Sequence, residues 1–382
     1  MKKRWLSTAL CAAMAAGTLA GCGLKTPETT TAAPAATEAA KEETKAEEKT
    51  EAAEGETKAE AAASGKYDTA NMPEVTLVYA EVNPLDTIVG QMATDFKEKV
   101  EELSDGKMTI DVQASGVLGS ENDVLDTMLG GGGTIDMSRI SAFALNGYGA
   151  KKSLLLSIPY TFADREHFWN FATSDLADEF LAEPVEQGLG VRGLFYGEEG
   201  FRHFFFKEEA NTLEDLKGLK IRVPSNEIQS KGFDVLGATS TGMALGDVYQ
   251  ALQTKTIDGA ENPLATLYGR KLHEVAKYLI LDGHVKNFTT WVVSADWFNS
   301  LTEEQQTWLL ETASEAGEYN NEVQQAAEAD YLQKMKDEGV TVVEPSEEVL
   351  AGFKEKAQPF YEMDFGWTDG LYDTVRAAMG AN

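Results

Sequence analysis

The stretch Leu219-Lys220-Ile221-Arg222-Val223-Pro224 gives the clearest local indication of the fold. Its apolar residues alternate with Lys220 and Arg222, which predicts a short strand with one apolar face and one cationic face. Proline has no backbone N–H to donate, so the strand should end at Pro224 and leave Arg222 near its carboxyl end. In open α/β sheets, ligands bind at that end of the strands.

Two further polar residues are expected close to Arg222. Arg202 lies just before a run of phenylalanines, and Asn262 precedes Pro263 after a short apolar strand at Thr256-Ile257. A guanidinium group holds a carboxylate through two hydrogen bonds. Two arginines and an amide at the ends of strand-like segments therefore suggest a pocket for a small carboxylate. On spacing alone, the alternative that both arginines form ordinary surface salt bridges stays open.

The chain before this stretch alternates between strand and helix patterns. Residues 75–80 form a nearly continuous apolar run, as expected of a strand that is covered on both faces. Apolar residues at helical spacing follow over 88–103. A second strand is expected at 108–112, a second helix around 124–129 and a third strand at 135–140. This order predicts a parallel sheet of the α/β class.

A long helix is expected in the second half of the chain. Thr302 and Gln305 stand at the positions of a capping box, and up to Glu338 Gly317 alone weakens the helical pattern. Such a helix would be about 50 Å long at 1.5 Å per residue. A second capping box, at Thr212 to Asp215, predicts a short helix ending at Gly218. A last strand is expected at 340–343, followed by a mainly helical tail.

The sequence resembles the solute-binding proteins of tripartite ATP-independent periplasmic (TRAP) transporters, of the DctP type. The resemblance covers the chain from about residue 75 to the C-terminus. Its matching residues are Asp215-Leu216-Lys217-Gly218-Leu219-Lys220-Ile221-Arg222-Val223-Pro224, Leu236-Gly237-Ala238, Met243, Val248-Tyr249-Gln250-Ala251-Leu252-Gln253-Thr254, Asp258-Gly259-Ala260-Glu261-Asn262-Pro263, Glu274-Val275-Ala276-Lys277-Tyr278 and His284.

The resemblance implies a two-lobed fold like that of periplasmic binding proteins. A ligand cleft should lie between the two α/β lobes, and the long helix should span both. The first lobe is expected to comprise residues 67–199 with 288–327, and the second residues 200–287 with 328–382. In that family the arginine of the strand motif clamps the substrate carboxylate, which implies this role for Arg222 with help from Asn262 and Arg202.

Further ligand contacts are implied on both sides of the cleft. Glu81 and Arg139 follow or end strands of the first lobe, in loops that match ligand-contacting positions of the family. The alternative is that either residue is simply an exposed charge. Met243 and Leu245 are expected in the wall that faces the substrate. Many relatives carry an aromatic residue after the methionine, where this chain has Ala244-Leu245.

The N-terminus has the pattern of a lipoprotein signal peptide, predicted over residues 1–21. A basic start is followed by a short apolar region, which is too short for a good membrane span. Leu19-Ala20-Gly21-Cys22 has the pattern of a lipobox, in which Cys22 is lipidated after cleavage. The other cysteine, Cys11, would be removed with the signal peptide, so no disulfide is expected. Residues 22–66, rich in Ala, Glu, Lys and Thr, should form a disordered tether.

Charge and composition argue against several function classes. The formal net charge of −30 over 382 residues argues against nucleic acid as a partner, since phosphate binding needs a basic face. His273-Glu274-Val275-Ala276-Lys277 starts like a zinc-protease helix but has lysine at the position of the second histidine ligand. Ala238-Thr239-Ser240-Thr241-Gly242 lacks the first glycine of a nucleophile elbow. We therefore expect no metal site, no cofactor and no enzymatic activity.

The sequence thus predicts a lipid-anchored protein outside the cytoplasmic membrane that captures a small carboxylate solute. The resemblance names its partners as the membrane permease subunits of a TRAP transporter. Glu81-Val82-Asn83-Pro84 and Asp136-Met137-Ser138-Arg139 resemble a uronate-binding branch, which favours a sugar acid such as a hexuronate. A C4-dicarboxylate or sialate stays open as the ligand. The alternatives are a secreted hydrolase or lyase acting on acidic sugars and, after it, a structural or adhesive surface lipoprotein.

Overall fold

The computed structural model describes residues 69–380, except 72–73, 132, 213, 226, 362 and 364–368. The predicted signal peptide, the lipobox at Cys22 and the predicted tether lie outside the described residues. The described residues belong to one compact unit, Ala59–Asn382. Within them, no helix has both the length and the apolar character needed to cross a membrane.

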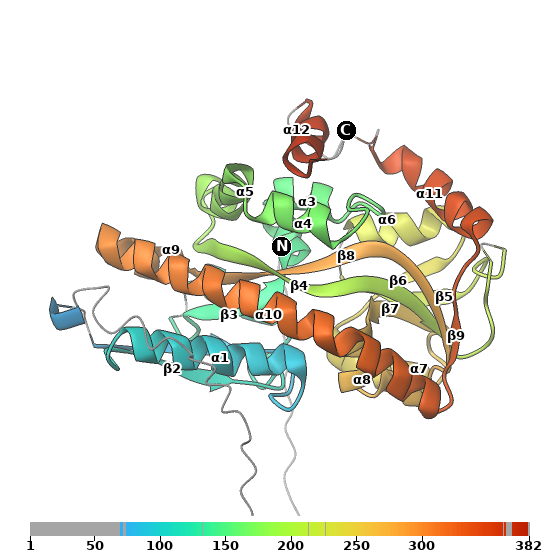
Figure 1. Ribbon diagram of the computed structural model, residues 1–382, viewed down its shortest axis with the longest axis horizontal. Coiled ribbons are helices and arrows are strands. Elements are labelled where there is room, and N and C mark those ends of the chain that lie inside the picture. Colours follow the sequence, from blue (N-terminus) through green and yellow to red (C-terminus); the bar gives the residue numbers. More distant parts are fainter. Residues whose placement is uncertain are drawn as a thin grey trace, which may run out of the picture. The chain divides into compact units, whose positions relative to one another are not determined.

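A mixed sheet of nine strands forms the centre of this unit (Figure 1). The strands are β1 (Val75–Ala80), β2 (Met108–Gln113), β3 (Met137–Ser141), β4 (Val191–Phe206), β5 (Lys220–Val223), β6 (Thr239–Gly242), β7 (Gly259–Pro263), β8 (Tyr278–Ser294) and β9 (Thr341–Val343). They lie in the order β2-β1-β3-β8-β4-β7-β5-β6, and β9 pairs with β8 beside this path.

The two ends of the sheet are parallel, and its centre is antiparallel. β1 pairs in parallel with β2 and β3, as the alternating pattern predicted. At the other end, β5 pairs in parallel with β6 and β7. Between these ends, β8 runs antiparallel to β3 and β4, and β4 runs antiparallel to β7. The predicted α/β class is confirmed, with one lobe built on each parallel end.

Helices cover both faces of the sheet (Figure 1). The α-helices are α1 (Ile88–Leu103), α2 (Glu121–Leu129), α3 (Lys152–Leu156), α4 (Arg165–Ala172), α5 (Asp175–Glu186), α6 (Glu227–Val235), α7 (Val248–Gln253), α8 (Leu264–Gly269), α9 (Ala295–Ser300), α10 (Glu303–Asp337), α11 (Glu347–Tyr361) and α12 (Leu371–Ala378). Short 3-10 helices are η1 (Thr69–Asn71), η2 (Ala142–Tyr148), η3 (Leu245–Asp247) and η4 (Leu272–Glu274).

The long helix α10 is confirmed and links the two lobes. It contains 35 residues and is therefore about 52 Å long at 1.5 Å per residue. The predicted capping box is present, because the Thr302 hydroxyl accepts from the N–H of Gln305 and the Gln305 side chain accepts from the N–H of Thr302. The helix packs on β4 and contacts α1 in one lobe and α8 in the other (Figure 1).

Two long strands, β4 and β8, pass through the middle of the sheet and connect its two ends. β4 carries the chain from the end of the sheet near β3 to the end near β7, and β8 carries it back. The pairing of β4 with β8 shifts register between Glu198 and Phe201 and again between Arg202 and Phe204. Gly200 has a φ of +86° at the first shift, and Gly283 in β8 has a φ of +55°. These shifts bend the strands between the lobes.

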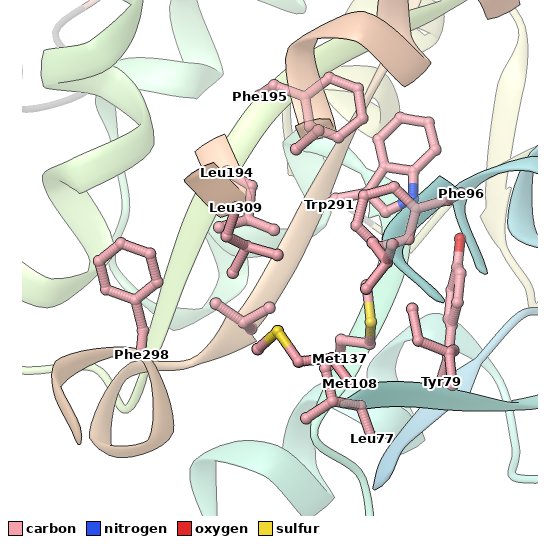
Figure 2. Packing of buried hydrophobic residues seen from close by; sticks show 14 of the residues in the cluster. Leu77, Tyr79, Phe96, Met108, Met137, Leu194, Phe195, Trp291, Phe298 and Leu309 are labelled. Atoms are coloured by element: carbon pink, nitrogen blue, oxygen red, sulfur yellow. The ribbon is translucent and has the colours of Figure 1, made fainter. Parts of the chain in front are cut away.

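The largest core cluster joins β1, β2 and β3 to the helices on one face (Figure 2). Phe96 of α1 and Leu309 of α10 are buried in it with Tyr79 of β1. Phe195 of β4 stacks on Trp291 of β8, with ring centroids 4.2 Å apart. Burial of such side chains, at about 1.5–3 kcal/mol each, keeps the strand ends of this lobe in place.

Two local predictions differ from the structure, and one strand was not predicted. Thr212 and Asp215 form the hydrogen bonds of a capping box, but 214–218 is a turn, because too few residues separate the cap from Gly218 to form a helix. Strand β6 was not predicted, since its residues have little apolar character. The expected strand at Thr256-Ile257 is displaced to β7, so Asn262 lies within a strand. There β7 pairs with both β4 and β5.

Candidate functional site

A cavity of about 370 Å³ lies between the two parallel ends of the sheet. Its size is within the usual range of pockets for small organic ligands. One wall comes from the loops after β1 and β2, the start of α2, and β3. The other comes from β5, β7, α8 and the segment after β6, and β4 and β8 contribute between them. The polar residues that line it include Asn83, Ser120, Glu121, Asp123, Arg139, Ser141, Glu199, Arg202, Arg222, Asn262, Arg270 and Asn287.

Arg222 is buried in the cavity wall, with 3% of its surface exposed. The sequence pattern placed Lys220 and Arg222 on one cationic face, but Lys220 is exposed whereas Arg222 is covered. Nε and Nη2 of Arg222 donate to the carbonyl oxygen of Met243 at 2.9 Å and 2.6 Å. Among the described side chains, no carboxylate forms an ion pair with Arg222. Burial lowers the pKa of Arg222 to about 10, and the charge of Glu261 offsets this only in part.

Asn262 offers a second buried donor to the same cavity. Its Oδ1 accepts from Nη2 of Arg202 at 3.2 Å, which fixes the orientation of the amide. Its Nδ2 is buried and has no hydrogen-bond partner among the described residues. An unpaired buried donor is costly, so a ligand acceptor at this position would remove that cost.

Arg202 lines the cavity, and its positive charge is balanced by a neighbouring carboxylate. Its Nε and Nη2 bind the carboxylate of Glu261, with 2.8 Å between Nη2 and Oε1. Its Nη1 donates to Oδ1 of Asn287 at 2.7 Å. His284 lies behind Glu261, with 3.4 Å between its Nε2 and Oε2 of Glu261. This network therefore positions Asn262 next to a guanidinium that is largely neutralised.

Arg139 is also neutralised, by two carboxylates. Nε and Nη2 donate to Glu81 at 3.0 Å each, and Nη1 lies 2.5 Å from Oε1 of Glu199. Burial would lower the pKa of Arg139, but Glu81 and Glu199 outweigh it and raise that pKa. Glu81 does not line the cavity. It lies buried behind Arg139, and its oxygens are bound to Arg139 and Asn83.

Met243 and Leu245 line the cavity, as the resemblance implied. The carbonyl of Met243 holds Arg222, and Leu245 begins η3. Both side chains also pack against the core cluster beneath α7 and α8. They give this wall an apolar portion next to the Arg222 guanidinium.

Sequence reasoning missed several cavity residues. Arg270 follows α8, and its Nη2 donates to the carbonyl of Val82 across the cavity. Glu121 opens α2, and Glu199 lies in β4. The signal that could have indicated Glu199 is Gly197-Glu198-Glu199-Gly200, which places two adjacent carboxylates in the middle of a largely apolar segment. No comparable local signal marks Arg270.

Similarity to known proteins agrees with this geometry. The model of the family DctP, bacterial extracellular solute-binding protein, family 7, matches residues 79–365. The chain belongs to this family. A solute-binding protein of Sulfitobacter sp. (strain NAS-14.1) is 32% identical over 284 residues, which cover 74% of this chain and 85% of the relative.

Solved structures of TRAP periplasmic solute-binding proteins share the DctP fold seen here. One, from Xanthobacter autotrophicus Py2 with bound β-D-galacturonate, is 28% identical, with a TM-score of 0.74 over 80% of this chain and 100% of that one. Another, from Ochrobacterium anthropi with bound L-fuconate, is 30% identical, with a TM-score of 0.74 over 80% of this chain and 99% of that one.

Membership of the DctP family establishes the general role. TRAP solute-binding proteins bind small carboxylates outside the cytoplasm and work with membrane permeases. The family and the fold are those of transport proteins rather than of enzymes. The predicted family and fold are thus confirmed.

Proposed function

We propose that this protein captures a sugar acid by its carboxylate, using Arg222 and Asn262, and delivers it to a TRAP-type permease. The observation that carries the proposal is that the same cavity is lined by an arginine without a carboxylate partner and by an unpaired amide donor. Arg222 has no carboxylate partner among the described side chains, and Nδ2 of Asn262 has no hydrogen-bond partner there. A carboxylate accepts from both and would restore the charge balance of Arg222.

Arg202, Arg139 and Glu81 have supporting roles in this proposal. Because Arg202 is bound to Glu261 and Arg139 to Glu81 and Glu199, they orient neighbouring groups and add little net charge. Met243 and Leu245 form the apolar part of the wall. The two lobes close on the ligand. The first lobe comprises residues 67–199 with 288–327, and the second comprises residues 200–287 with 328–382.

The ligand class rests on the polar character of the cavity and on the neighbouring structures. Hydroxyl, amide and charged groups far outnumber the apolar side chains along its wall. The similar proteins described above hold galacturonate and fuconate. A hexuronate or a related sugar acid is therefore favoured over a C4-dicarboxylate or sialate. We also propose that Cys22 carries the lipid that anchors the protein at the outer side of the cytoplasmic membrane.

A binding screen tests this function. The full chain, purified in detergent, is heated with galacturonate, fuconate, succinate or sialate while intrinsic tryptophan fluorescence is followed. A ligand at 100 times its Kd stabilises the folded state by about 2.7 kcal/mol, which raises Tm. We expect a sugar acid to give the largest shift and to be recovered chemically unchanged. Conversion of the acid to product would favour the hydrolase or lyase alternative, and the absence of any sugar-acid shift would refute the ligand class.

A further inference from the structure

We infer that Glu121 and Arg270 form a second subsite of the cavity, which binds hydroxyl groups of the solute and disfavours a second carboxylate. The inference rests on the proposed function, in which Arg222 and Asn262 hold the first carboxylate. It narrows the substrate class to monocarboxylate sugar acids.

Glu121 is aimed into the cavity by the loop before α2. Gly119 in this loop has a φ of +109°, and a Cβ there would lie 2.6 Å from Cβ of Asp123, so the loop folds tightly onto the first turn of the helix. Oε1 of Glu121 accepts from the backbone N–H of Ser141 at 2.6 Å and from its hydroxyl at 3.0 Å. Oε2 has no hydrogen-bond partner among the described residues. The carboxylate is therefore held in place through Oε1, and Oε2 remains able to accept a hydrogen bond from a solute.

The other carboxylates that line the cavity are either bound through both oxygens, as in Glu199, or exposed, as in Asp123. Glu199 holds Arg139 with Oε1 and accepts from Nδ2 of Asn287 at 2.7 Å with Oε2. Asp123 caps α2, because its Oδ2 accepts from the backbone and hydroxyl of Ser120. Among the described residues, Glu121 is thus the half-buried carboxylate with accepting capacity left for a solute.

Arg270 supplies donors from the other lobe. It follows α8, and its guanidinium reaches the loop after β1, where Nη2 donates to the carbonyl of Val82 and Nε lies 3.4 Å from Oδ1 of Asn83. Its Nη1 has no partner among the described residues. Burial lowers the pKa of Arg270, whereas the charges of Glu81, Glu199 and Glu121 act in the opposite direction. Glu121 and Arg270 line the same cavity from opposite lobes and form no ion pair with each other.

A hydroxyl group fits this combination of charges best. It can donate to Oε2 of Glu121 and accept from Arg270, and neighbouring hydroxyls of a sugar chain can satisfy both. A second carboxylate could pair with Arg270, but it would lie close to the carboxylate of Glu121. Burial raises the pKa of Glu121, whereas the hydrogen bonds from Ser141 and the charge of Arg139 act in the opposite direction. Repulsion of this kind is how a site rejects a near-identical ligand. The cavity should therefore accept aldonates or uronates and reject aldarates.

Matched acid pairs test the subsite by isothermal titration calorimetry on the full chain in detergent. D-gluconate is compared with D-glucarate, and D-galacturonate with galactarate; the second acid of each pair carries one more carboxylate on the same carbon chain. We expect the unmodified protein to bind the monocarboxylate at least about tenfold more tightly, because like charges in a closed site are strongly unfavourable. Glu121→Gln keeps an oxygen for Ser141 and should reduce this preference at least about fivefold, mainly by tighter binding of the dicarboxylate.

Asp126→Asn is the matched control, because it makes the same charge change on α2 at an exposed position outside the cavity. It should leave the preference unchanged. If Glu121→Gln weakened the binding of both acids of a pair equally, the role of Glu121 would be purely structural and the inference would be overturned. Equal binding of both acids to the unmodified protein would also overturn it, a result that leaves the Arg222 site standing. If none of the four acids binds, the sugar-acid function fails as well.

Discussion

The backbone carbonyl oxygen of Met243 accepts hydrogen bonds from both Nε and Nη2 of Arg222, at 2.9 Å and 2.6 Å. These bonds fix the plane of the guanidinium group without neutralising it, because a carbonyl carries no net charge. The burial of Arg222 lowers its pKa to about 10, which is the electrostatic sign of a cation without a matching anion. The arginine is thus oriented before a ligand arrives, which reduces the entropy lost on binding.

Removal of Arg222 should weaken ligand binding more than any other single change in the cavity. Arg222→Ala leaves the ligand carboxylate without its charged partner and should cost about 2–5 kcal/mol, or roughly 30-fold to several-thousand-fold in Kd. Arg222→Lys should restore part of this loss, since an ammonium group lacks the two-pronged geometry. Calorimetric titration with the acid identified in the screen measures both effects.

Lys220→Ala provides the control for Arg222. It removes a cation from the same strand, but at an exposed position that does not line the cavity. Its Kd should equal that of the unmodified protein. A folded Arg222→Ala protein with unchanged affinity would show that the ligand lies elsewhere.

Asn262→Ala should weaken binding and, without ligand, lower the stability of the protein only slightly. Its Nδ2 has no partner among the described residues. The change removes the hydrogen bond that Oδ1 accepts from Nη2 of Arg202, but Nη2 keeps its bonds to Glu261. In the complex, loss of one neutral donor should cost about 0.5–2 kcal/mol. Thermal unfolding without ligand and titration with ligand separate the two effects. A fall in ligand-free Tm with unchanged Kd would contradict the proposed role.

His284 should make the protein less stable as the pH rises from about 6.5 to about 9. Burial would lower the pKa of His284, but Asp282, at 2.7 Å from Nδ1, and Glu261 outweigh it and raise the pKa to about 9. In that window the folded state holds a proton that the unfolded state has released, so stability is complete below pH 6.5 and declines above it. The loss should be about 1–3 kcal/mol.

Urea unfolding at several pH values checks this dependence. His284→Gln cannot take up the proton, so its stability should change much less between pH 6.5 and 9, although it is lower at pH 6.5. If the unmodified protein and the variant lose the same free energy of unfolding over this window, His284 does not carry the effect.

Ligand binding should bring the two lobes closer together. The carboxylate clamp lies on β5 and β7, whereas Glu121 lies at the start of α2, so a bound solute contacts both lobes. The register shifts of β4 against β8 near Gly200 and the positive φ of Gly283 place the bending in these strands. Small-angle scattering should show a smaller radius of gyration with saturating ligand. The Arg222→Ala protein at the same ligand concentration is the control, and an equal radius with and without ligand would count against closure.

Cys22→Ser should release the protein from the membrane. If Cys22 carries a diacyl anchor, its loss leaves no strong membrane attachment, since stable anchoring requires such acyl chains. Fractionation of cells into membrane and soluble parts measures the release. Cys11→Ser, within the predicted signal peptide, should leave the protein in the membrane fraction. Retention of the Cys22→Ser protein there would refute lipid anchoring at this residue.

The sequence by itself determined the features that depend on neighbours along the chain. The strand that carries Arg222 follows from alternation and from Pro224, and α10 follows from its capping box and the absence of strong helix breakers. The strand and helix order also predicted the parallel end of the sheet formed by β1, β2 and β3. Such patterns are local, because backbone geometry and side-chain spacing act over a few residues.

The tertiary structure alone decided the charge state of the cavity. Arg139 pairs with Glu81, 58 positions away, and with Glu199, 60 positions away. Arg202 pairs with Glu261, 59 positions away. These pairs follow from how strands distant in sequence lie beside each other in one sheet, which no local pattern encodes. Arg222 has no such carboxylate partner among the described side chains and so keeps its charge for a ligand, although the sequence presented all three residues simply as arginines.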